Sequence, residues 1–158
     1  MEQTISLARN HNAIFSIVGD LKTEKVVPVL SNDIRWYFIL DFESTCFTQG
    51  STGQTILHPE IIEFPVVLLD GEKRRIHDIF HRFVRPTEVP ELSSFCRELT
   101  GIRQSDVSSA NDLEKVLKEF ESWLRMKKEG LSCNFKTSSG AVNAVFVTWT
   151  DWDISECL

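Results

Sequence analysis

The sequence predicts an α/β domain with a mixed sheet and flanking helices, because apolar runs typical of strands stand on both sides of segments with helical spacing. From Ile34 to Asp41, a nearly continuous apolar run indicates a central strand covered on both faces. Residues 91–100 and 111–124 instead carry apolar side chains every three or four positions. With 158 residues, 42% of them apolar, the chain can form one domain with an ordinary core.

Three further strands are expected, at residues 61–70, 75–86 and 141–149. Pro65 in the first of them marks an edge or an irregularity. Asp70-Gly71 signals a hairpin, whose polar continuation makes the loop longer than the tightest type. The antiparallel strand after it should be half-exposed, with three apolar residues on one face: Ile76, Phe80 and Val84.

Two helices are expected between the third and fourth strands. The first, residues 91–100, ends before Gly101, a favourable residue just past a helix. Its helically spaced apolar residues are Leu92, Phe95, Cys96 and Leu99. The second begins at Asn111-x-x-Glu114, which resembles a capping box. Behind this start one apolar stripe follows, formed by Leu113, Val116, Leu117, Phe120 and Leu124.

The ends and the composition exclude several classes of protein. Residues 1–30 show no clear period and are expected to form a weakly structured leader, so the domain would span residues 31–158. No secretory signal is recognisable, and no apolar run approaches the roughly 18 residues of a membrane span. The cysteines lack disulfide-framework or zinc spacing, and the net charge of −6 argues against a general nucleic-acid binder. We expect no membrane and no disulfide partner, and a cytoplasmic or nuclear location.

Two pairs of acids follow two of the predicted strands. Asp41 and Glu43 follow the first strand, and Asp151 and Asp153 follow the last. Residues two apart in a strand share a face. If these strands are neighbours, three or four carboxylates converge at one edge of the sheet and raise one another's pKa. Mg²⁺ or Mn²⁺ would relieve this repulsion, and two ions about 3.5–4 Å apart are typical of polymerases and nucleases.

Simpler interpretations of these residues remain open at this point. A D-x-E pattern by itself is common by chance. Asp153-x-x-Glu156 also fits the N-cap and capping box of a helix, and Asp151 fits a solvated turn. His77 and His81 would share a face of a strand, where a structural role is more common than metal binding.

Four phrases taken together carry a resemblance to a known family: FILDFESTC, HPEIIEFPVVLL, RPTEVPELSSFCRELTGI and FVTWTDWDIS. In this order they resemble the DEDD-type (DEDDh) 3′→5′ exonucleases. More narrowly, they resemble the enhanced-RNA-interference and histone-mRNA 3′-end exoribonuclease group and its exonuclease-domain-containing relatives. The similarity runs from about Ile34 to the last residue. It implies an RNase H-like exonuclease fold, two Mg²⁺ ions with Mn²⁺ as a substitute, and removal of nucleotides from single-stranded RNA 3′ ends.

The resemblance also implies roles for individual residues. The metal ligands would be Asp41, Glu43 and Asp153, whereas Asp151 does not match a ligand. Glu43 and Ser44 would hold the terminal nucleotide. The pocket for the 3′-terminal base and sugar would contain Phe95, Leu99 and Thr100, with Trp152 as an aromatic beside the base. Without the resemblance, Phe95 and Leu99 would be interpreted as core residues.

One departure from the family pattern limits this interpretation. The family completes its site with a third motif, a general-base His and a further Asp on a C-terminal helix. Here five residues follow Asp153, and all four histidines precede it. The chain is therefore expected to be an exonuclease domain that lacks its C-terminal part. The alternatives are a catalytically inactive remnant that binds nucleic acid or a protein, and an acidic α/β domain with structural carboxylates.

Overall fold

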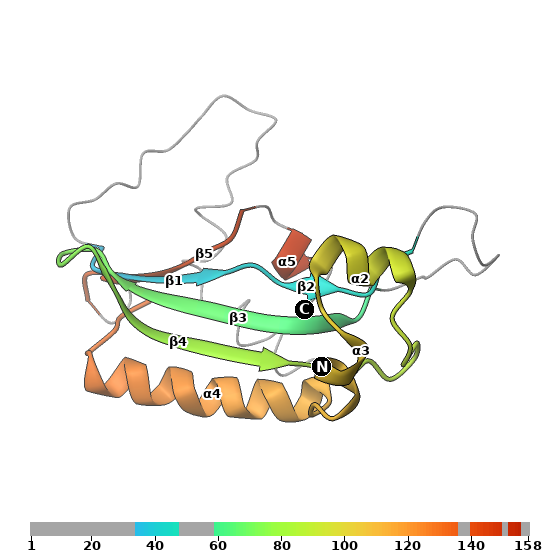
Figure 1. The fold of residues 1–158 in the computed structure, drawn as a ribbon. Coiled ribbons are helices and arrows are strands. Elements are labelled where there is room, and N and C mark those ends of the chain that lie inside the picture. Colours follow the sequence, from blue (N-terminus) through green and yellow to red (C-terminus); the bar gives the residue numbers. More distant parts are fainter. Residues whose placement is uncertain (1–33, 48–58, 136–139, 150–151, 156–158) are drawn as a thin grey trace.

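The computed structural model describes residues 34–47, 59–135, 140–149 and 152–155, so the proposed leader, residues 1–30, lies outside the described residues (Figure 1). The described strands are β1 (Trp36–Leu40), β2 (Glu43–Ser44), β3 (Ile61–Asp70), β4 (Arg75–Phe83) and β5 (Ala144–Val147). The described helices are α2 (Ser94–Thr100), α3 (Gln104–Ser108), α4 (Leu113–Gly130) and α5 (Trp152–Ser155). None of the described helices combines the length and apolarity that crossing a bilayer requires.

The strands form the mixed sheet that the sequence predicts. β3 lies between β1 and β4 and pairs antiparallel with both, so that Val66 faces Leu40 on one side and Phe80 on the other. β5 pairs with β1 in parallel, with Ile39 opposite Val147. The predicted first and last strands are therefore neighbours. β3 also has the predicted bounds, residues 61–70, and Pro65 lies within it.

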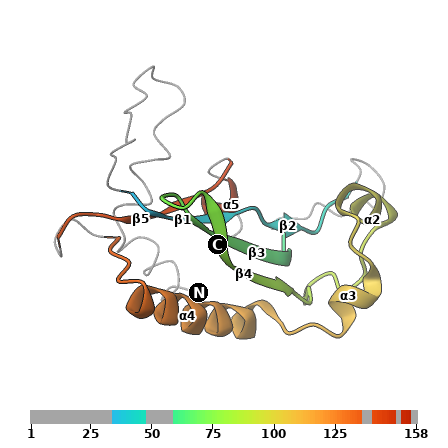
Figure 2. The same ribbon diagram turned by 60° about the vertical axis from the view of Figure 1, so that its left-hand side comes forward.

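The helix α4 covers one face of the sheet, and the short helix α5 lies on the opposite side. Figures 1 and 2 show α4 below the sheet, α5 on the opposite side near β1 and β2, and α2 beyond the end of β2. Phe64 lies at the centre of the core, with ring centroids 4.4 Å from Phe42, 5.9 Å from Phe80 and 5.1 Å from Phe120. The apolar stripe predicted on α4 packs into this core. Trp123 of the same helix joins it and donates a hydrogen bond of 3.1 Å to Asp78.

A second, smaller core fixes α2 and α3 at the end of the sheet. Its buried members are Ile62, Leu92, Cys96, Ile102 and Val107. Ser93 caps α2, because its hydroxyl accepts a bond from the Cys96 amide and donates one of 2.7 Å to the carbonyl of Cys46. The cap explains why α2 begins at Ser94 and not at residue 91. The helix ends, as predicted, before Gly101, whose φ of 74° suits glycine.

Other boundaries also differ from the prediction. β1 and β5 span 36–40 and 144–147, shorter than the predicted 34–41 and 141–149. α3 was not predicted from the sequence, because it has only five residues. Its start is held by Asp106, whose carboxylate accepts a bond of 3.0 Å from the Arg103 amide.

The predicted face of β4 is wrong at one end. Leu68 pairs with Asp78 and Leu69 with Ile76, so His77 is an extra residue at a β-bulge. The bulge reverses the alternation, which leaves Ile76 56% exposed although Phe80 is buried. It also separates the two histidines: His77 packs edge-on against Trp36, and His81 contacts Glu63. β4 ends at Phe83, so the buried Val84 lies just outside it.

The predicted N-cap of α4 is also wrong by one residue. The cap is Asp112, whose Oδ1 accepts a bond of 3.0 Å from the Lys115 amide. Asn111 is used elsewhere, because its carbonyl accepts the Arg85 amide at 2.9 Å and its side-chain nitrogen donates to Glu119.

Replacing the observed cap tests this assignment. Asp112→Ala is expected to lower the free energy of unfolding by about 1 kcal/mol, because one amide at the start of α4 loses its partner. Asp112→Asn keeps an acceptor of nearly equal capping strength and should stay close to the parent. Urea unfolding followed by circular dichroism measures both, and equal losses in the two variants would contradict a capping role.

Candidate active site

Phe42 positions the two acids beside it. Its ring is buried against Phe64, with only 4% of the residue exposed. Asp41 and Glu43 flank it in nearly extended chain and therefore point to the opposite side. Asp41 is exposed and Glu43 half-buried. The shared face predicted for these acids follows from burial of the residue between them.

Asp153 joins them from the other end of the chain. Its carboxylate, in α5, is buried and accepts a hydrogen bond of 2.8 Å from the main-chain amide of Phe42. The bond connects residues 111 positions apart and brings the second acidic motif onto the peptide between Asp41 and Glu43. Asp153 is the second residue of α5, so the N-cap interpretation is wrong. Asp151 lies outside the described residues.

The three carboxylates repel one another. Burial, followed by the charges of Asp41, Glu63 and Asp153, raises the pKa of Glu43. Burial is also the main cause that raises the pKa of Asp153, against the lowering effect of the bond from the Phe42 amide. No Lys or Arg of the described residues forms an ion pair with Asp41, Glu43 or Asp153.

This donor set fits a hard divalent cation in chemistry. Carboxylate oxygens are the ligands that Mg²⁺ and Mn²⁺ prefer, and a cation between them would offset the repulsion. Among the described residues, however, no three His, Cys, Asp or Glu side chains are already grouped closely enough to hold a metal.

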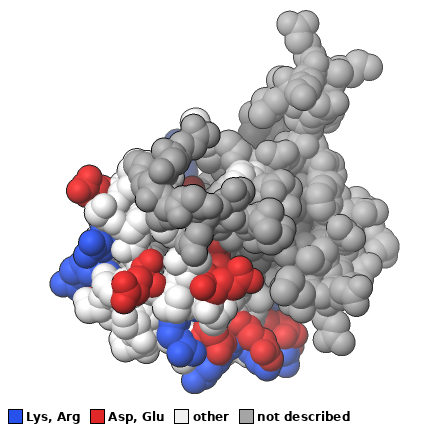
Figure 3. Space-filling view, turned by 90° about the vertical axis from the view of Figure 1, so that its right-hand side faces the viewer, with Lys and Arg blue, Asp and Glu red and all other residues white. Residues whose placement is uncertain are grey.

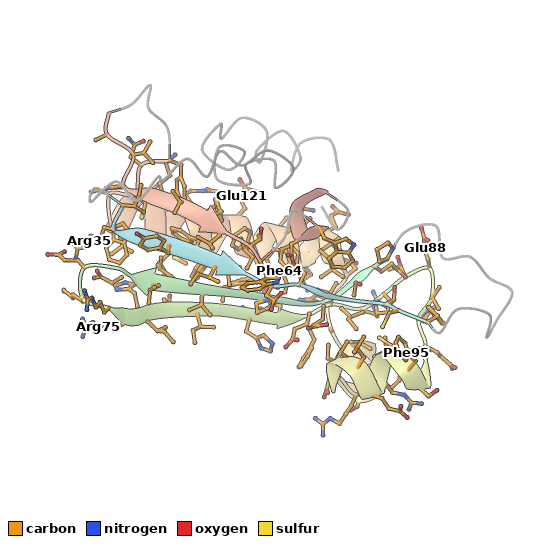
Figure 4. All side chains as sticks on the ribbon, turned by 90° about the horizontal axis from the view of Figure 1, so that it is seen from above. Arg35, Phe64, Arg75, Glu88, Phe95 and Glu121 are labelled. Atoms are coloured by element: carbon orange, nitrogen blue, oxygen red, sulfur yellow. The ribbon has the colours of Figure 1, made fainter. Side chains whose placement is uncertain are left out.

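Apolar side chains lie exposed on the neighbouring helices. Phe95 and Leu99 of α2 are 37% and 66% exposed, whereas Cys96 between them is buried. The interpretation of Phe95 and Leu99 as core residues is therefore wrong. Figure 4 shows Phe95 at the opposite end of the molecule from Arg35 and Arg75. Trp152 of α5 is 37% exposed as well.

Two other residues of the predicted pocket have different surroundings. Ser44 is buried, and its carbonyl accepts a bond of 3.6 Å from the Cys96 thiol. The Thr100 hydroxyl donates a bond of 2.8 Å to the Cys96 carbonyl and accepts one from the Ile102 amide. This hydroxyl fixes the end of α2, so it is already engaged within the protein.

Glu63 and His81 are neighbours of the site that the sequence analysis missed. Glu63 lies directly opposite Glu43 in the β2–β3 pairing. Its Oε1 is 2.5 Å from Nε2 of His81. For Glu63, the available sequence signal was an acid inside the otherwise apolar strand 61–70. The pairing of β2 with β3 could not be predicted, because β2 has only two residues.

Comparisons with known proteins identify the family of this chain. Residues 38–157 match the family model RNase_T, described as Exonuclease. The chain is 48% identical over 136 residues to ERI1 exoribonuclease 2 of Danio rerio, covering 82% of this chain and 24% of that protein. It is 36% identical over 140 residues to the 3′-5′ exonuclease Snipper of Drosophila melanogaster, covering 87% of this chain and 50% of that protein.

Solved structures show the same fold. The nuclease domain of 3′hExo, a DEDDh family member bound to rAMP, superposes with a TM-score of 0.62 at 38% identity, over 77% of this chain and 55% of that one. A 3′-exonuclease solved for its recognition of a histone mRNA stem-loop gives 0.62 at 34% identity, over 79% and 50%. The chain thus spans 24% and 50% of the length of the two relatives from Danio rerio and Drosophila melanogaster. Membership of the DEDDh exonucleases implies dependence on a divalent metal ion. On the fold, the two acidic motifs and these matches, the chain belongs to the exonuclease family, within its DEDDh group of RNase H-like fold.

Proposed function

We propose that this chain carries the two acidic motifs of a metal-dependent 3′→5′ exoribonuclease, which removes nucleotides from single-stranded RNA 3′ ends. The observation that carries the proposal is the 2.8 Å hydrogen bond from the Phe42 amide to Asp153, because it joins the two motifs at one sheet edge. For location, we propose the cytoplasm or the nucleus, where thiols stay reduced.

Each acid has a role in this proposal. Asp41, Glu43 and Asp153 hold two Mg²⁺ ions, for which Mn²⁺ can substitute. When bound, such ions stabilise charge on the phosphate and lower the pKa of an attacking water. Glu43 is half-buried and close to three other acids, Asp41, Glu63 and Asp153, which makes it the candidate for orienting the attacking water. The main chain at Phe42 keeps Asp153 in place throughout.

Apolar contacts hold the nucleotide in this proposal. Trp152 stacks on the terminal base, and the exposed Phe95 and Leu99 face it from α2. Ser44 and Thr100 complete this pocket. The Cys96 thiol donates to the main-chain carbonyl of Ser44, and the Thr100 hydroxyl donates to the carbonyl of Cys96. This mode of binding suits an acidic chain: on the described part of the surface in Figure 3, basic side chains are interspersed with acidic ones and form no continuous basic area.

The proposal is tested with 5′-labelled single-stranded RNA incubated with Mg²⁺. With the His and Asp of the third motif present on the chain, the expected products are labelled strands shortened one nucleotide at a time, with no internal cuts. An RNA that ends in a 3′-phosphate should be degraded more slowly, and Asp153→Ala should abolish shortening. Cleavage that persists without a divalent metal, or internal fragments as first products, would refute an exonuclease of this class.

A second candidate function is a binding module without catalysis. It is favoured by the exposed aromatic residues Phe95 and Trp152, because stacking on bases needs no metal ion. The same assay separates the two candidates, because a binding module retains RNA of full length while still shifting its mobility in a native gel.

The contribution of Trp152 to binding is a further prediction. Trp152→Ala should weaken binding of a short RNA with a free 3′-hydroxyl by about 1–3 kcal/mol, because one stacked base loses its partner. Trp152→Phe keeps an aromatic face and should retain most of the affinity. A fluorescence titration with 5′-labelled RNA measures both variants, and equal affinities of Trp152→Ala and the parent would argue against the stacking role.

A further inference from the structure

Trp149 is an exposed aromatic residue that the assigned pocket does not include. It is 90% exposed, the largest exposed fraction among the large apolar side chains of the described residues. The other described tryptophans differ from it: Trp36 and Trp123 belong to the core, and Trp152 is 37% exposed. Packing within the described part of the chain therefore does not explain why a tryptophan stands at this position.

The topology brings Trp149 to the same sheet edge as the first acidic motif. The last pair in the parallel ladder is Ile39 with Val147. Asp41 lies two residues beyond Ile39, and Trp149 lies two residues beyond Val147. Asp41 and Trp149 thus follow β1 and β5 at the same end of their parallel ladder, and α5, which contains Asp153, begins three residues after Trp149.

We propose that Trp149 stacks on the base of a nucleotide upstream of the terminal one, so that the site holds a single strand at two successive aromatic positions. This inference rests on the proposed function, in which Trp152 takes the terminal base. A strand whose scissile phosphate lies at Asp41, Glu43 and Asp153 has its next nucleotides near these acids, at the end of the β1–β5 ladder that the exposed Trp149 follows.

Physical considerations favour a base as the occupant. Every base has an apolar face, so stacking holds single strands without selecting a sequence. A stacked ring adds affinity without positive charge, which suits a chain whose net charge is −6. It also predicts that the enzyme prefers an unpaired end, because a base that is paired in a duplex is less free to stack on a side chain.

The test compares two ligands, AMP and a 5′-fluorescein hexa-adenylate whose phosphorothioate linkages slow cleavage, with Mn²⁺ present. Trp149→Ala is expected to raise the Kd for the hexamer by about 5- to 100-fold and to leave the Kd for AMP within about twofold. Trp149→Phe should keep most of the hexamer affinity. Trp152→Ala, in contrast, should weaken binding of both ligands.

Each other outcome decides against one of the two proposals. Unchanged hexamer affinity in Trp149→Ala, with both ligands weakened in Trp152→Ala, overturns the upstream stacking site and leaves the proposed function standing. Equal losses for AMP and hexamer in Trp149→Ala assign Trp149 to the terminal pocket and overturn the upstream position. If the parent binds neither ligand, or if Trp152→Ala changes neither affinity, the proposed function fails first. A lower unfolding temperature of Trp149→Ala with unchanged RNA affinity shows a packing role instead.

Discussion

The double variant Asp41→Asn with Glu43→Gln is expected to lose Mn²⁺ binding and, in metal-free buffer, to unfold at a higher temperature than the parent. Metal binding is lost because two neutral amides replace the charged ligands of the first motif. Burial and the charges of Asp41, Glu63 and Asp153 raise the pKa of Glu43, so its ionised form is disfavoured in the folded state. Replacing it with a neutral amide therefore stabilises the folded state. Removing unfavourable charges commonly adds about 0.5–2 kcal/mol, and solvent screening around the partly exposed Glu43 places the expected gain at the lower end of this range.

The same repulsion fixes the direction of the pH dependence. The pKa values of Glu43 and Asp153 are raised in the folded state, so these groups bind protons more readily when folded than when unfolded. Their unfavourable contribution is present at neutral pH. It diminishes as the pH falls through the raised values, and it vanishes below the unfolded values near 4. The stability difference between the variant and the metal-free parent should therefore narrow as the pH is lowered to about 4.

A matched control separates the site from overall charge. Glu121→Gln with Glu129→Gln also removes two negative charges, but from the exposed surface of α4. This control should bind Mn²⁺ as the parent does, in calorimetry at pH 7, and should unfold at nearly the same temperature. Unchanged Mn²⁺ affinity in Asp41→Asn with Glu43→Gln would refute the proposed metal site.

The elements that the sequence predicted well are those with strong local patterns. The strand at 61–70 is apolar along its whole length and bounded by polar segments, and β3 has these limits. The stripe on α4 repeats over three turns and packs against the sheet as expected. The α4 boundary failed because Asn111 and Asp112 are both good caps. A distant contact, the Arg85 amide on the Asn111 carbonyl, takes part in holding Asn111 outside the helix.

The error on β4 has a different cause. One extra residue, His77, interrupts the pairing with β3, and every side chain before it changes face. Ile76 then stands 56% exposed in a position that strict alternation assigns to the interior. Nothing in the local sequence marks this residue as a bulge, because no glycine or proline accompanies it.

The candidate site was likewise predicted where it depends on local sequence and not where it depends on distant contacts. Alternation around Phe42 was enough to predict that Asp41 and Glu43 share a face. The approach of Asp153 depends on a hydrogen bond across 111 residues, so periodicity could suggest it only as a condition on strand order. Phe95 and Leu99 have the spacing of a core face and yet are exposed, so spacing alone does not show whether a helix face is buried.

Phe42 connects the core to the site, and Phe42→Ala is expected to lower the free energy of unfolding by about 3–5 kcal/mol, as large-to-small changes at buried aromatic residues do. The ring is buried, with its centroid 4.4 Å from that of Phe64, and its loss leaves a cavity below the acidic motif. Phe42→Leu fills most of this space and keeps the amide that holds Asp153, so it should lose less than about 1.5 kcal/mol.

The consequence for the site follows from the same packing. The buried ring keeps the Phe42 amide pointing at Asp153, and therefore keeps the two acidic motifs together. In Phe42→Leu we expect Mn²⁺ affinity close to that of the parent. In Phe42→Ala, at temperatures where circular dichroism still shows a folded chain, the affinity should fall together with the urea midpoint. If Phe42→Ala unfolds at the urea concentration of the parent, or loses stability while binding Mn²⁺ equally well, then burial of this ring does not hold the acids in position.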